Sequence, residues 1–133
     1  ELLKGVHDFT ATTGNTFKIA LYTSDATLGA GTTAYSTSNE ITNSSGTAYT
    51  AGGATLTSVT PTSSSTTALC DFSDVSYTSA SFTANGALIY NDSASGDPAV
   101  CAIAFGADKT VTSGTFTIQF PAAAATTAII RLA

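Results

Sequence analysis

Gly86-Ala-Leu-Ile-Tyr-Asn91 and Val100-Cys-Ala-Ile-Ala-Phe-Gly106 are the two stretches of this sequence that stay apolar at nearly every position. Strands without polar alternation are typical of sheets that are covered on both faces. Asp97 and Pro98 stand between the two stretches, among other residues that favour turns. We therefore expect two central strands of a packed sheet, joined by a polar hairpin.

The rest of the sequence extends this β pattern over one domain. Alanine, serine and threonine make up about half of the chain, and no long segment shows a helical apolar period. We expect a turn at 61–65 and short strands at 16–22, 54–59, 66–72, 75–77, 81–84, 87–90, 100–105, 115–120 and 128–132. This spacing predicts an all-β fold, an antiparallel β-sandwich or jelly roll of about eight strands.

The first residues are predicted to be separate from this domain. We expect a short N-terminal arm over residues 1–12 and a single β-sandwich domain over 13–133. The apolar residues of the arm are Leu2, Leu3, Val6 and Phe9. Their roughly helical spacing predicts a helical turn or an arm that docks on a neighbour or on its own domain. Residues 23–47 form a polar loop, and a loop of this length is usually functional or packed on a partner.

One segment of the chain is echoed later in the sequence. Asp74–Thr83 matches Asp108–Thr117 at Asp, Thr, Ser, Phe and Thr. The echo indicates either a duplicated hairpin or similar turn-into-strand chemistry that arose twice in a sequence rich in serine and threonine. Both interpretations place a phenylalanine inward, just after a serine or threonine turn.

The charge of the chain argues against two classes of partner. Only 10% of the residues are charged, and the formal net charge is −5. A nucleic-acid or anionic-membrane surface would need a basic patch. No apolar run approaches the length of a membrane span. We therefore expect neither nucleic acid nor a membrane as a partner.

Few side chains indicate catalysis or metal binding. His7, the only histidine, lies in the arm, and no Gly-x-Ser-x-Gly nucleophile motif occurs. The loop 91–97 has oxygen side chains like those of a calcium loop, but Ala102 stands where the bidentate acid would be. Cys70 and Cys101 are either buried thiols or partners in a disulfide between strands. We predict no enzyme activity, no cofactor and no metal site.

Structural motifs over most of the chain carry a resemblance to a known family. They are Phe17-Lys-Ile-Ala-Leu-Tyr-Thr-Ser24, Thr33-Ala-Tyr35, Tyr49-Thr-Ala-Gly-Gly53, Gly86-Ala-Leu-Ile-Tyr-Asn91, Val100–Lys109, Phe116-Thr-Ile-Gln-Phe-Pro121 and Ala128-Ile-Ile-Arg-Leu132. In these motifs the chain is similar to small structural proteins of tailed bacteriophage particles. Ala102 and Ala104 are smaller than the family pattern, and Asn85 stands where many relatives have arginine. Any intersubunit contact of that arginine is in doubt here.

The resemblance implies a capsid decoration, or cement, protein made in the cytoplasm of the bacterial host. It would bind the capsid exterior as a homotrimer or other homo-oligomer. Its partner would be the major capsid protein, and it would stabilise the shell because it binds only the assembled state. The candidate interface residues are Leu2, Leu3, Val6, Phe9, Tyr22, Tyr35 and Tyr49. The tyrosines are either aromatic anchors or partly buried in their own domain.

Two other functions remain open from the sequence. A tail or fibre module that binds a host surface receptor would show an exposed aromatic cluster and a solvent-facing loop tip. A pilin-like surface subunit would leave an unpaired groove that a neighbour's strand fills. A self-contained sandwich in the monomer would count against this last function.

Overall fold

The computed structural model describes residues 4–42 and 48–133, and this part of the chain is built from β-strands. They are β1 (Phe17–Tyr22), β2 (Ala54–Thr55), β3 (Ser58–Ser64), β4 (Thr67–Phe72), β5 (Val75–Asn91), β6 (Ala99–Ile118) and β7 (Ile130–Leu132). Two antiparallel sheets result, one in the order β2–β1–β5–β6 and one in the order β3–β4–β7. The predicted all-β class is confirmed. Within the described ranges, no helix is long and apolar enough to cross a bilayer.

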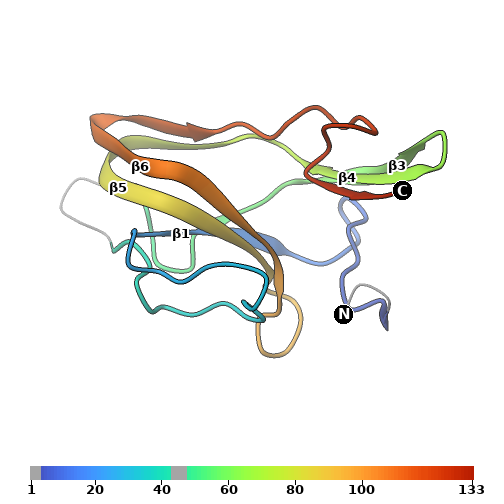
Figure 1. The fold of residues 1–133 in the computed structure, drawn as a ribbon, viewed down its shortest axis with the longest axis horizontal. Coiled ribbons are helices and arrows are strands. Elements are labelled where there is room, and N and C mark those ends of the chain that lie inside the picture. Colours follow the sequence, from blue (N-terminus) through green and yellow to red (C-terminus); the bar gives the residue numbers. More distant parts are fainter. Residues whose placement is uncertain (1–3, 43–47) are drawn as a thin grey trace.

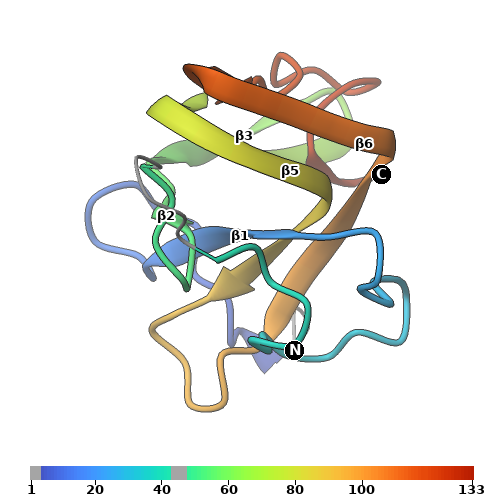
Figure 2. The same ribbon diagram turned by 90° about the vertical axis from the view of Figure 1, so that its left-hand side faces the viewer.

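β5 and β6 form one long curved ribbon. They pair from Val75 opposite Ile118 to Tyr90 opposite Ala99, with several register shifts along the way. Figures 1 and 2 show the two strands bending together, so that the two halves of each strand lie one above the other. Gly106 of β6 takes a φ of 77°, which a residue without Cβ adopts at little cost. The curved ribbon thus provides two walls of one apolar interior.

The ribbon replaces five of the predicted short strands. The segments 75–77, 81–84 and 87–90 are parts of β5, and 100–105 with most of 115–120 are parts of β6. The predicted breaks within β5 coincide with register shifts. A bulge adds a residue to one strand and lets the strand continue, so its local sequence resembles a turn. The described residues therefore form seven strands.

The turn or hairpin tip predicted at 61–65 is the tip of a β3–β4 hairpin, but it is shorter than predicted and begins later. β3 runs through Pro61, and the turn occupies only Ser65 and Thr66. β3 is the edge strand of its sheet, and its register with β4 shifts between Val59 and Thr62. Proline is tolerated there because the free side of an edge strand needs no amide donor. The register shift also leaves Pro61 without a paired residue in β4.

The two echoed segments pair with each other along the ribbon. Ser76 lies opposite Thr117, and Thr83 lies opposite Thr110. In each of these pairs the two side-chain hydroxyls are 2.8 Å apart. The pairs are equivalent in the echo, so the segments are related by a local two-fold arrangement. They are two strands of one ribbon and not a duplicated hairpin.

Bulges stand where the echo predicted turns. Ser79 and Ser113 occupy matching positions and take φ values of 54° and 47°. Phe82 and Phe116 follow them, with ring centroids 5.0 Å apart, and both pack against the main core. The predicted inward phenylalanines are confirmed, although a bulge and not a turn precedes each of them.

The two apolar stretches that open the sequence analysis differ in their position. Every residue of Gly86–Asn91 is buried between β1 and β6, as predicted for a central strand. Val100–Gly106 is not central, because β6 is the edge strand of its sheet. Ala102 and Ala104 are exposed, and they alternate with partly buried residues. The edge of this sheet is therefore apolar on both of its faces.

Residues 6–15 dock on their own domain. The amide nitrogen of the buried Asn91 donates to the carbonyl of Val6 at 3.1 Å and to Oδ1 of Asn15 at 3.0 Å. Phe9 is buried and stacks on Phe17, with ring centroids 4.5 Å apart. The sequence left open whether the N-terminal segment docks on a neighbour or on its own domain. From Val6 onward it docks on its own domain.

Candidate functional site

The candidate site is a groove beside the unpaired edge of β6, which we call the β6 groove. It has a volume of about 510 Å³ and lies between the two halves of β6 and the segment that follows. Its apolar walls come from Ile103, Phe105, Phe116, Ile118, Phe120 and Ile129. These side chains belong to the main core, yet each keeps part of its surface exposed. The interior of the domain is thus uncovered on this side.

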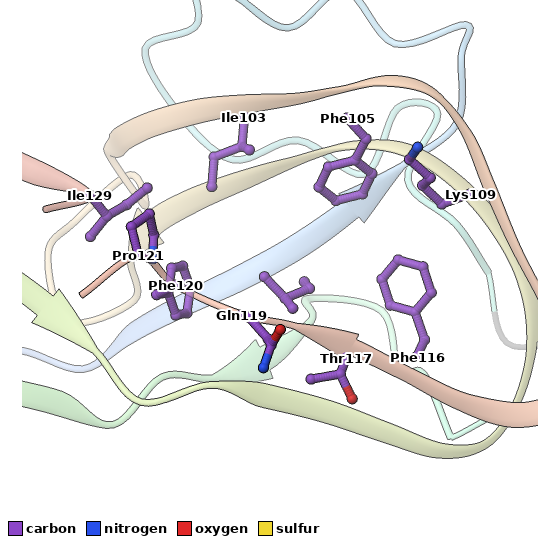
Figure 3. Close-up of a pocket in the computed structure, with 10 residues that line it drawn as sticks. Ile103, Phe105, Lys109, Phe116, Thr117, Gln119, Phe120, Pro121 and Ile129 are labelled. Atoms are coloured by element: carbon purple, nitrogen blue, oxygen red, sulfur yellow. The ribbon is translucent and has the colours of Figure 1, made fainter. Parts of the chain in front are cut away.

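The walls of the β6 groove face each other across the bend of the ribbon. Figure 3 shows Phe105 and Phe116 on opposite sides, and their ring centroids are 6.3 Å apart. Ile129 and Pro121 lie at the far end of the groove from these two rings (Figure 3). An extended apolar segment could lie along this groove, because its length follows β6.

The edge of β6 beside the groove has unused pairing capacity. In the described part of the chain, β6 pairs with β5 on one side only. The loop after β1 hydrogen-bonds only to the start of β6, where the amide of Ala99 donates to the carbonyl of Thr33. Farther along, Leu28 and Gly29 of this loop line a small pocket with Ala102 and Ala104. From Val100 to Ala107 the strand contains no charged residue and no proline. Natural edge strands normally carry such residues to prevent pairing with another chain.

One charge lies in this apolar setting. Lys109 is the only charged residue among the described ones that line the β6 groove. Figure 3 shows its side chain at the end of the groove next to Phe105. Within the described residues its ammonium makes no ion pair, and the neighbouring Asp108 accepts a hydrogen bond from the amide of Asn85 at 2.8 Å. The groove therefore combines apolar walls with one unmatched positive charge.

The predicted interface residues do not gather at the β6 groove. Leu2 and Leu3 lie outside the described residues. Val6 and Phe9 belong to the docked N-terminal segment, and Phe9 is buried. This arm therefore offers little apolar surface to a partner from Val6 onward.

The predicted tyrosines serve the chain's own packing. Tyr22 and Tyr49 are buried, which corrects their assignment as surface anchors in favour of the alternative that they pack inside their own domain. Tyr35 is partly exposed and stacks on Tyr90, with ring centroids 4.5 Å apart. The aromatic rings are large enough to hold the long loop after β1 on the sheet. Partial burial within their own domain was the alternative to a role as surface anchors.

Glu40 organises these tyrosines. Its carboxylate is buried and accepts hydrogen bonds from the hydroxyls of Tyr35 at 2.6 Å and Tyr49 at 2.5 Å. It also accepts the backbone amide of Gly52 at 2.7 Å. The hydroxyl of Tyr49 in turn accepts the amide of Leu21 in β1. The cluster joins the loop, β1 and the segment before β2, so it is a structural clasp.

Burial changes the acidity of this cluster and of the thiols. Burial, and then the hydrogen bond to Glu40, raise the pKa of both Tyr35 and Tyr49 well above the ordinary value. Burial raises the pKa of Tyr77 to about 12. Cys70 and Cys101 are both free, and burial raises the pKa of Cys101 to about 11. Thiols of this kind are poor nucleophiles near neutral pH.

The remaining candidates of the sequence analysis are dispersed. The loop 92–98 is the predicted polar hairpin between β5 and β6. His7 contacts Asn91, which fixes it against the domain. No three His, Cys, Asp or Glu residues gather as metal ligands in the described ranges.

The β6 groove is not among the sites predicted from the sequence. Its one visible signal was the alternation of larger and smaller residues in Val100–Phe105, with Ala102 and Ala104 on the exposed side. The chain was also compared with known proteins. It matches no protein-family model, no curated protein and no solved structure.

Proposed function

We propose that this chain is a structural subunit of a tailed bacteriophage particle, a capsid decoration protein that binds the outer surface of the major capsid lattice. In this proposal its two sheets are the layers of a β-sandwich of jelly-roll type, and the subunits act as trimers. Such a protein stabilises the shell by mass action, because it binds the assembled lattice and not the free capsid subunit.

The observation that carries the proposal is the uncovered apolar interior beside the bare edge of β6. A strand without charge or proline at a sheet edge is a template for pairing with another chain. Apolar surface of this kind is typical of an interaction site with protein. These features support an assembly function, and the kind of particle is proposed from the resemblance of the sequence motifs to those of virion proteins.

A second function gains support from the same groove. A pilin-like surface subunit requires an apolar groove along an unpaired edge, into which a neighbour inserts a strand. The β6 groove and the edge at Val100–Phe105 meet this requirement. The two functions differ in the object assembled, which is a phage shell in one case and a bacterial surface fibre in the other.

Quantitative mass spectrometry of purified phage particles tests the proposal. The particles should come from the phage whose genome encodes this sequence. A capsid decoration protein should occur in numbers comparable with the major capsid protein. A few copies per particle would instead support a tail or fibre module, and recovery only with bacterial surface fibres would support the second function.

A further inference from the structure

We infer that the β6 groove receives an extended segment of a different protein chain, which adds a strand to the edge Val100–Phe105 and places an acidic side chain against Lys109. The segment would carry apolar residues at alternating positions. This inference rests on the proposed function only in assuming that a partner chain exists, and it specifies the chemistry by which that partner is recognised.

The backbone of β6 supplies the first part of the argument. Val100–Phe105 pairs with β5 on one side, and in the described residues its other side has no strand. Each further strand in an antiparallel sheet satisfies amides and carbonyls of the edge. A peptide therefore suits this edge better than a lipid, which has no backbone donors and acceptors to offer.

The side chains supply the second part. Residues along an added strand point alternately to the two faces of the sheet. On one face they would cover Ile103 and Phe105, whose surfaces are only partly buried. On the other face they would meet Ala102 and Ala104, which line a pocket of about 220 Å³ with Leu28 and Gly29 of the loop after β1. The residues of the incoming segment that face Ile103 and Phe105 should thus be large and apolar. The residues between them should be less restricted in size and polarity.

Lys109 supplies the charge complementarity. Its ammonium lies at the end of an apolar groove and, among the described residues, has no acidic partner. Lys109 is exposed, so a strand with a carboxylate at this end would form an ion pair at the rim of the groove, where charge complementarity favours the correct partner over others. A chain without that carboxylate would leave the lysine unmatched.

The same charge argues against the β6 edge of a second copy of this chain as the occupant. The bare edge of another β6 carries no acidic residue from Val100 to Ala107. The nearest one, Asp108, is already hydrogen-bonded to Asn85. A β6-to-β6 pair would satisfy the backbone but would give Lys109 no counter-charge from the paired strand.

A display library of random linear peptides, selected on the purified chain, tests the inference. The selected peptides should alternate apolar residues and share one acidic position. A synthetic peptide with the selected consensus is then the probe, and its binding is measured by fluorescence anisotropy. Hydrogen exchange should show new protection of amides in Val100–Phe105 when this peptide is bound.

Three variants make the test specific. Lys109→Glu should weaken binding of the consensus peptide about tenfold, and selection on this variant should favour basic residues in place of acidic ones. Lys4→Glu is the matched control, since Lys4 is also exposed and does not line the groove; it should leave binding unchanged. Ile103→Thr, which keeps a β-branched residue in the strand, should weaken binding through lost apolar contact.

Other outcomes would overturn the inference. They are a failure to enrich any consensus, equal binding to wild type and Lys109→Glu, and protection outside β6. A dimer of the free chain with a protected β6 edge would make a second copy the occupant. Binding of dodecanoate in the groove without any peptide would make it a lipid site. These experiments use the chain alone, so they can fail while the particle experiment succeeds, and the reverse also holds.

Discussion

Glu40 connects three parts of the chain through one buried carboxylate. It accepts hydrogen bonds from Tyr35, Tyr49 and the amide of Gly52. Hydrogen bonds to a charged acceptor are stronger than those between neutral groups, and the loss of one partner leaves the others unsatisfied. This residue therefore has a larger part in stability than its position in a polar loop indicates.

We expect Glu40→Ala to lower the free energy of unfolding by about 2–4 kcal/mol, because buried hydroxyl and amide donors lose their acceptor. Urea denaturation followed by tyrosine fluorescence measures the change. Asp25→Ala is the control, since Asp25 is an exposed acid in the same loop. An equal, small effect of the two substitutions would contradict the role of Glu40 as a clasp.

The buried tyrosines predict a loss of stability at high pH. Their ordinary pKa is 10.0, and burial raises the pKa of Tyr77 to about 12 and that of Tyr49 further. The unfolded chain releases these protons at a lower pH than the folded chain does. Stability should therefore be complete below the unfolded pKa and fall as the pH rises through the raised folded values.

Urea midpoints at neutral pH and at pH about 11 measure this effect, together with the near-ultraviolet absorbance of tyrosinate. The midpoint should drop at the higher pH, and tyrosinate should appear together with unfolding. Tyrosinate that forms in the folded protein, with no change of midpoint, would show that the rings are accessible and would contradict their burial.

Two glycines with positive φ allow the steric effect of an added side chain to be compared with the cost of the backbone conformation alone. Gly53, with a φ of 78°, precedes β2, and a Cβ built on it would lie 1.9 Å from the carbonyl oxygen of Ile19. Gly106 in β6 has a φ of 77°, and a Cβ there would meet nothing within 4 Å. The backbone conformations are alike, but only at Gly53 would a Cβ collide with another strand.

Gly53→Ala should therefore destabilise the fold by more than about 3 kcal/mol, since β1 and β2 must move apart. Gly106→Ala, its matched control, should cost only about 1 kcal/mol for the strained φ. Thermal unfolding of the two variants measures the difference. Similar melting temperatures would show that the close approach of Gly53 to β1 does not constrain the fold.

The sequence predicted the all-β class, β1, β4 and the buried strand Gly86–Asn91, because these depend on local patterns of apolar and turn residues. It did not predict that β5 and β6 are continuous. Ser79 has the same local signature whether it forms a turn or a bulge, and the partner strand decides between them. Pro61 in an edge strand is a further case, because edge position is a tertiary property.

The β6 groove could not be predicted from local sequence patterns for a similar reason. Val100–Phe105 reads as a central strand because it is apolar throughout, whereas the sheet order places it at an edge. Tyr22 and Tyr49 were candidate anchors, but their burial depends on a contact with Glu40 that spans the long loop. Neither the strand order nor this contact leaves a periodic signal in the sequence.

The molecule as a whole is a small all-β domain whose apolar interior is partly exposed along β6. The N-terminal segment from Val6 and the loop after β1 are both fastened to the domain itself. The β6 groove is thus a partly exposed apolar surface, in the described part of the chain, that is left for a partner. A protein with this surface is suited to a fixed place in an assembly.

Cryo-electron microscopy of intact phage particles tests this account most directly. The account predicts density for the chain on the outer icosahedral lattice, in many copies, grouped as trimers and in contact with the major capsid protein. The β6 edge should be covered by a strand in that density. Density confined to the tail, or a shell that carries no copy of this chain, would contradict the capsid function.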